Sequence, residues 1–111
     1  MTTKTQRELV DQALANLGVL TPGQTATADD VATVDAYVGP LIEDLSVREI
    51  VTIQDTEEIE ERYFLHLAVL LADACKYEFG GGAFDVVTAE QRLRRMGRAG
   101  PTYEVQTTEY F

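Results

Sequence analysis

The chain has 111 residues, of which 45% are hydrophobic, enough for one small domain with a single core and too few for two domains. The 19 acidic and nine basic residues give a formal net charge of −10, which disfavours general nucleic-acid binding because that binding needs Lys and Arg to neutralise phosphates. One cysteine and one histidine leave no internal disulfide and no evident His/Cys metal set.

The first predicted helix starts after Thr5. Glu8 follows Thr5 by three residues, as in a capping box, where the two side chains satisfy free N–H groups at a helix start. Apolar residues then recur at helical spacing until Gly18, namely Leu9, Val10, Ala13, Leu14 and Leu17.

A second helix is predicted over residues 28–46, after the turn-rich connector VLTPGQTAT. Thr27 and Asp30 form another cap-like pair before the apolar positions Val31, Val34, Val38, Leu41, Ile42 and Leu45. Gly39 and Pro40 lie inside this helix. Because proline lacks an N–H group and its ring clashes with the preceding turn, we expect a kink or break near residue 38.

The segment after the second predicted helix has a sequence that favours extended structure over helix. Residues 50–53 are all β-branched, so a short strand or extended link is predicted near 49–54. The acidic run DTEEIEE, residues 55–61, follows, and because negative charge is favourable at a helix N-terminus, the third helix is predicted to start there. Its apolar positions cover more than one stripe and predict the most buried element: Tyr63, Phe64, Leu67, Ala68, Leu70, Leu71, Ala74, Cys75 and Phe79.

The triple glycine 80–82 is predicted to end that helix. A fourth helix is expected from about residue 84 to 97, with Phe84, Val87, Leu93 and Met96 facing inward. After Gly100 and Pro101 the chain alternates apolar and polar side chains with period two, a pattern typical of a strand.

These elements predict an all-α fold, a small bundle of about four helices with an extended segment near 49–54. The chain divides into a helical domain, 1–99, and an extended C-terminal docking tail, 100–111. Whether the 49–54 segment pairs within one subunit or between subunits stays open at this point.

Residues suited to catalysis are sparse. His66 lies between two leucines, and Cys75 lies among Ala72, Ala74 and Phe79, where a cysteine usually behaves as a small buried hydrophobe. The triple glycine is followed by neither a lysine nor a GxGxxG spacing, so it indicates a turn rather than a phosphate loop. We therefore expect no enzyme, no cofactor and no metal.

No apolar run approaches the roughly 18 residues of a membrane span. The stretch MTTKTQRELV lacks the apolar core of a signal peptide. We therefore expect no membrane association.

Two charged patches are the candidate interaction residues. The acidic patch comprises Glu57, Glu58, Glu60 and Glu61, and the basic patch comprises Arg92, Arg95 and Arg98, with Arg94 beside them. Each is either a solvated helix face or one half of a heterologous contact, in which one subunit's acidic surface meets the next subunit's basic surface.

The order and spacing of three segments carry a resemblance. LVDQALANLGV (9–19), TADDVATVDAYVGPLIEDL (27–45) and YFLHLAVLLADACKYEFG (63–80), followed by a closing basic helix, resemble the head-to-tail connector proteins of tailed bacteriophages, also called adaptor or head-completion proteins. The resemblance spans nearly the whole chain. It rests on the order of these motifs rather than on any single residue.

The resemblance implies a structural protein of the virion neck, made in the cytoplasm of a bacterial host. About twelve copies would form a ring under the portal protein, extend the DNA channel and present a platform to the next tail or stopper protein. DNA would pass through an acidic ring without specific binding. The tail would then dock on the portal as an added strand, through Tyr103, Val105, Thr107, Tyr110 and Phe111.

The alternative is a free acidic helical interaction module, such as a DNA-mimicking inhibitor or an antitoxin-like protein. A DNA mimic should spread its carboxylates over one continuous face. Here they cluster at predicted helix starts and the basic residues come late in the chain, which favours the connector.

Overall fold

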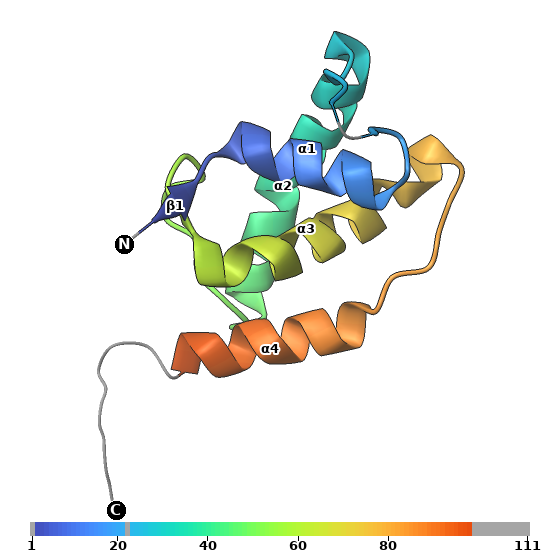
Figure 1. Ribbon diagram of the computed structural model, residues 1–111. Helices are drawn as coiled ribbons and strands as arrows, with labels where there is room; N and C mark the ends of the chain where they lie inside the picture. The colour runs from blue at the N-terminus through green and yellow to red at the C-terminus, as the bar shows by residue number, and fades with distance from the viewer. Residues whose placement is uncertain (1, 22, 99–111) are drawn as a thin grey trace, which may run out of the picture.

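The computed structural model describes residues 2–21 and 23–98, and this part of the chain is mostly helical (Figure 1). The α-helices are α1, Gln6–Asn16; α2, Ala28–Val47; α3, Glu61–Cys75; and α4, Val86–Arg98. A 3₁₀ helix, η1, Lys76–Phe79, continues from α3. Two short antiparallel strands, β1, Thr3–Lys4, and β2, Ile59–Glu60, pair Thr3 with Glu60 and Lys4 with Ile59. The predicted all-α class is confirmed.

The starts of α1 and α2 follow from their own sequences. The Thr5 hydroxyl accepts a hydrogen bond from the Glu8 N–H (3.2 Å), and the Glu8 carboxylate accepts one from the Thr5 N–H (2.9 Å). This is the predicted capping box. The hydroxyl of Thr27 likewise accepts from the Asp30 N–H (3.2 Å) and begins α2.

The ends of α1 and α2 share one hydrogen-bond pattern. After α1, Gly18 N–H donates to Ala15 C=O and Val19 N–H to Leu14 C=O, with Gly18 in the left-handed region at φ 79°. After α2, the equivalent bonds run from Glu49 to Ser46 and from Ile50 to Leu45. Both ends are Schellman motifs, but the second places Glu49 at φ 57°, a conformation that costs a residue with a Cβ atom more than it costs glycine.

The expected break near residue 38 is wrong, because α2 continues through Pro40 to Val47. Proline removes one hydrogen bond from the helix ladder. Val34, Val38 and Leu45 are fully or almost fully buried on either side of it, so the core holds both halves in one helix.

The core surrounds α3, as predicted. In Figure 1, α1 lies beside α3, α2 crosses behind both, and α4 lies on the other side of α3. Leu67 and Leu71 are fully buried. Other fully buried large side chains come from α1, α2, β2 and α4, among them Leu9, Val10, Leu14, Val34, Leu45, Ile59 and Leu93.

Of the two alternatives for residues 49–54, the structure excludes the strand, because residues 51–53 adopt no regular structure and the strand lies later, at Ile59–Glu60. Two other predictions need correction. The third helix starts at Glu61 rather than near residue 55, because the acidic run forms a turn and then β2. Val87 of α4 is 66% exposed, whereas Ala89 and Leu93 are buried, since the inward face of α4 follows Ala89, Leu93 and Met96.

Among the described helices, none combines the length and the apolar character needed to cross a bilayer.

Candidate interaction surfaces

The acidic segment, residues 55–61, is a turn held from inside the fold. The Asp55 carboxylate accepts a hydrogen bond from the Glu57 N–H (2.9 Å), and Glu58 N–H donates to the Asp55 carbonyl (3.1 Å). The Thr56 hydroxyl donates to the Gln6 side-chain oxygen (2.5 Å), and the Gln6 amide donates to Asp35 on α2 (2.6 Å). Gln6, the first residue of α1, therefore ties the acidic segment to α1 and, through Asp35, to α2.

Three of the four predicted acidic contact residues point to solvent. Glu57, Glu58 and Glu61 are exposed, and none forms an ion pair with another described residue. Glu60 is different, because it is partly buried in β2 and its carboxylate lies 2.8 Å from Nε of Arg62. Of the four predicted contact glutamates, three are therefore exposed and unpaired among the described residues.

The arginines of α4 also differ from the other arginines. Arg7, Arg48 and Arg62 each form an ion pair inside the subunit. By contrast, Arg92, Arg94 and Arg95 pair with no carboxylate among the described residues, and Arg92 and Arg95 are exposed. The side chain of Arg98 lies outside the described part of the chain.

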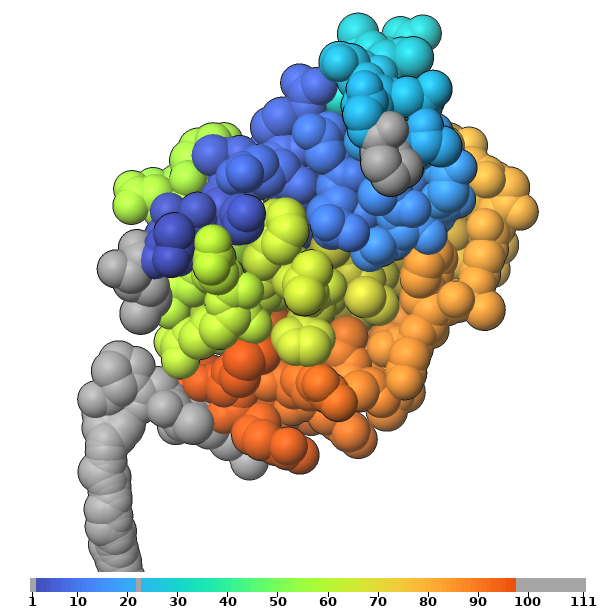
Figure 2. Space-filling model, viewed as in Figure 1, coloured from blue at the N-terminus to red at the C-terminus, as the bar shows by residue number. Residues whose placement is uncertain are grey.

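Arg92 and Arg94 lie on different flanks of α4. Burial of the His66 imidazole lowers its pKa below the ordinary 6.5, and the nearby positive charge of Arg92 lowers it further, which places Arg92 on the α3 side. Figure 2 shows α3 as a yellow-green strip exposed between α1 and α4. Arg94 instead lines a hollow with Glu49–Thr52. The arginine surface, Arg92 and Arg95, is therefore separate from that hollow.

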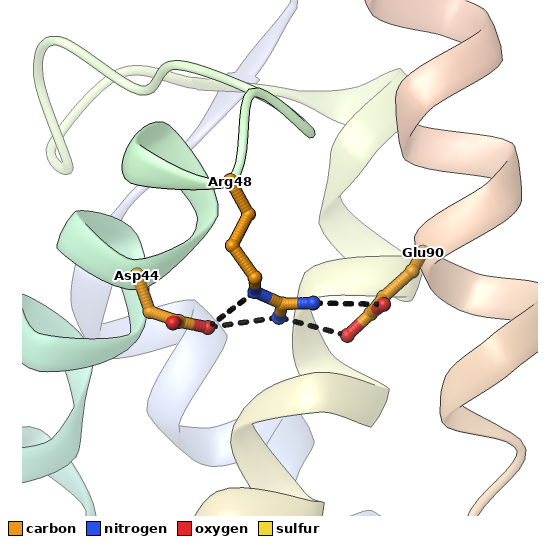
Figure 3. Close-up of polar contacts among 3 residues, drawn as sticks. All are labelled: Asp44, Arg48 and Glu90. Atoms are coloured by element: carbon orange, nitrogen blue, oxygen red, sulfur yellow. Dashed lines mark hydrogen bonds and ion pairs between the residues drawn. The ribbon is translucent and has the colours of Figure 1, made fainter.

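One ion-pair cluster fixes the position of α4. Arg48, at the end of α2, lies between Asp44 of the same helix and Glu90 of α4 (Figure 3). Its Nη2 is 2.8 Å from Asp44 and 2.9 Å from Glu90, and Nη1 also donates to Glu90 (3.2 Å). These hydrogen bonds to Glu90 and Asp44 raise the pKa of Arg48. This cluster could not be predicted from local sequence, because Glu90 is 42 residues away from Arg48 in the chain.

A groove runs between the end of α4 and the acidic segment. It consists of two hollows of about 390 Å³ each, and Thr52 and Tyr63 line both. Arg94 and Gly97 line the first hollow, while Asp55, Glu58 and Glu60 line the second. Burial raises the pKa of Tyr63. The Arg62 guanidinium lies over the Tyr63 ring, 4.7 Å from the ring centroid. We call this feature the Tyr63 groove.

The two groups considered for catalysis are not brought together. The Cys75 thiol is fully buried and donates to the Leu71 carbonyl (3.1 Å), and burial raises its pKa, which keeps it protonated at neutral pH. His66 is partly exposed on the opposite flank of α3. Among residues 2–21 and 23–98, no three His, Cys, Asp or Glu side chains cluster as metal ligands.

No protein-family model matches the chain, and no curated protein or solved structure matches it either. The predicted docking residues Tyr103, Val105, Thr107, Tyr110 and Phe111 lie outside the described residues. The candidate interaction surfaces are therefore the acidic segment, the arginine surface and the Tyr63 groove.

Proposed function

We propose that this protein is a structural connector subunit that assembles head to tail into a ring in the neck of a tailed phage or phage-like particle. The observation that carries the proposal is the arginine surface of α4. Arg92 and Arg95 are exposed cations without a partner among the described residues, whereas Arg7, Arg48 and Arg62 are all paired. The exposed carboxylates Glu57, Glu58 and Glu61 supply the opposite charge on a different element.

A heterologous contact needs two distinct complementary surfaces on one subunit, because each copy offers one and receives the other. The acidic segment and the arginine surface meet this requirement. Such charge pairs set register and association rate more than affinity, so the contact should weaken as salt increases.

The resemblance supplies the rest of the proposal. About twelve copies would assemble under the portal, and the net charge of −10 per chain would let DNA slide through the ring without binding. The C-terminal segment would dock on the portal, and the opposite face would receive the next tail or stopper protein.

The test is a charge exchange. Arg92→Glu with Arg95→Glu should reduce ring formation, measured by gel filtration and electron microscopy at low salt. Adding Glu57→Arg and Glu58→Arg should restore the ring if the two surfaces meet. The control is Arg7→Glu with Asp11→Arg, which exchanges a pair inside α1 and should leave assembly unchanged.

Two results would contradict the proposal. A wild-type protein that remains a monomer at every concentration, with or without portal protein, would favour the free acidic interaction module. A ring that forms equally well after the arginine reversal would show that α4 does not supply the contact.

A further inference from the structure

The backbone of residues 51–54 has unused hydrogen-bonding capacity. Its flanks are held, by Ile50 N–H to Leu45 C=O (2.9 Å) and by Glu58 N–H to Asp55 C=O (3.1 Å). Between them, the N–H and C=O groups of Val51, Thr52, Ile53 and Gln54 form no hydrogen bond with any described residue. Buried backbone groups are rarely left unpaired, and Val51 is only 6% exposed.

This segment is suited to receive a strand. Its residues 51–53 are β-branched, and it borders the Tyr63 groove, whose two hollows meet at Thr52. A strand added here would gain main-chain hydrogen bonds, and alternate side chains would enter the hollows on either side of Tyr63. We call residues 51–54 the acceptor edge.

The position of the end of α4 indicates which segment could pair with the acceptor edge. α4 ends at Arg98. Gly97 lines the same groove, and a Cβ atom added there would lie 3.5 Å from the Ile50 carbonyl oxygen. Thirteen residues follow Arg98, which reach about 43 Å when extended. The acceptor edge needs only about 13 Å.

We propose that residues 102–107, TYEVQT, add to the acceptor edge of the same chain as a parallel strand. The pairing is parallel because the segment starts beside Ile50, and the acceptor edge runs from there toward Gln54. Ala99, Gly100 and Pro101 supply the turn. Arg94 lines the hollow nearest to α4, where it offers a positive charge to Glu104.

A short tether favours docking within one chain, because it gives an effective concentration on the order of millimolar. Docking covers an edge that would otherwise be open to pairing with other chains. A partner with a better edge can displace the strand, so the docking segment is stored on its own subunit until assembly. The docking does not depend on the proposed connector function, since it is tested on the purified protein without any partner.

The first experiment is a disulfide test in the full chain. Gln54→Cys with Gln106→Cys, which lie opposite each other if residue 102 pairs with Ile50, should form a disulfide within the monomer, detected by peptide mapping, because the fully buried Cys75 does not compete. The control pair, Val87→Cys with Gln106→Cys, places the first thiol at an exposed site on α4. The test pair should oxidise at least about tenfold faster than the control. Equal rates, or a disulfide found only between two chains, would overturn the proposal.

The second experiment measures amide hydrogen exchange at Thr52 and Ile53. Val105→Pro removes a donor in the middle of the added strand and should speed exchange at the acceptor edge at least about tenfold. Glu109→Pro, which lies beyond the strand, should leave it unchanged. The same exchange rate in Val105→Pro and in the wild type would also overturn the proposal.

Discussion

Two leucines on α3 differ in burial, so the same substitution at each separates the effect of burial on stability from the effect of helix propensity. Leu67 is fully buried in the core, and Leu65, two residues earlier, is 61% exposed. Leu67→Asp would bury a carboxylate without a partner, so the variant should unfold at room temperature. Leu65→Asp makes the same chemical change in the same helix and should lower the free energy of unfolding by less than about 1 kcal/mol. Urea titration followed by circular dichroism measures both, and similar values would show that the core is assigned wrongly.

His66 reports on the arginine surface. It is the single histidine of the chain, so its pKa can be read directly by NMR. Because burial and then Arg92 lower this pKa, Arg92→Gln should raise it, and Arg95→Gln should leave it nearly unchanged. An equal response to both substitutions would mean that Arg92 has no special proximity to His66.

The same shift predicts a pH dependence of stability. The folded state holds His66 with a pKa below the ordinary 6.5, so the unfolded state binds more protons between these two values. Stability should therefore fall as pH decreases from about 6.5 through the folded pKa. His66→Gln should reduce that slope, measured as the urea midpoint at several pH values. If the urea midpoint changes equally with pH in the wild type and in His66→Gln, the pH dependence arises from the carboxylates and not from His66.

Among the elements, the two Schellman ends offer a matched comparison. Glu49 holds the left-handed position after α2 that Gly18 holds after α1. Glu49→Gly should raise the free energy of unfolding by about 1 kcal/mol, because glycine adopts this conformation without steric cost. Gly18→Ala should lower it by a similar amount, although a Cβ atom there would meet nothing within 4 Å. Thermal melting compares the two variants. A loss of stability in Glu49→Gly would show that the left-handed conformation of Glu49 does not destabilise the fold.

The elements also show which information is local in the sequence. The helix starts at Thr5 and Thr27 were predictable because a cap needs only residues three positions apart. The start of α3 was not, since β2 forms by pairing Ile59 and Glu60 with residues 3 and 4. The break expected near Pro40 was wrong for a related reason, because burial of Val38 and Leu45 outweighs one lost hydrogen bond.

The candidate sites divide in the same way. The exposed carboxylates and the arginine surface were predictable from charge runs alone. The Arg48 cluster and the Tyr63 groove were not, because both depend on where α4 packs against the end of α2 and the segment that follows it.

At the scale of the whole molecule, net charge competes with the ion pairs. A formal charge of −10 on 111 residues makes the folded chain repel itself, and salt screens that repulsion. Salt also weakens surface ion pairs, but each contributes only about 0–1 kcal/mol. The melting temperature should therefore rise between 10 and about 150 mM NaCl at pH 7. An unchanged or lower melting temperature would mean that the pairs, and the Arg48 cluster above all, outweigh the repulsion.

The single thiol of the chain gives experimental access to motions of the central helix. Cys75 is fully buried and hydrogen-bonded to Leu71, so a thiol reagent can modify it only when α3 opens transiently. The labelling rate in the native state then measures how often the last turn of α3 separates from its neighbours. Comparing that rate before and after the proposed assembly would show whether a contact with other copies stiffens the interior of the subunit, with no added probe.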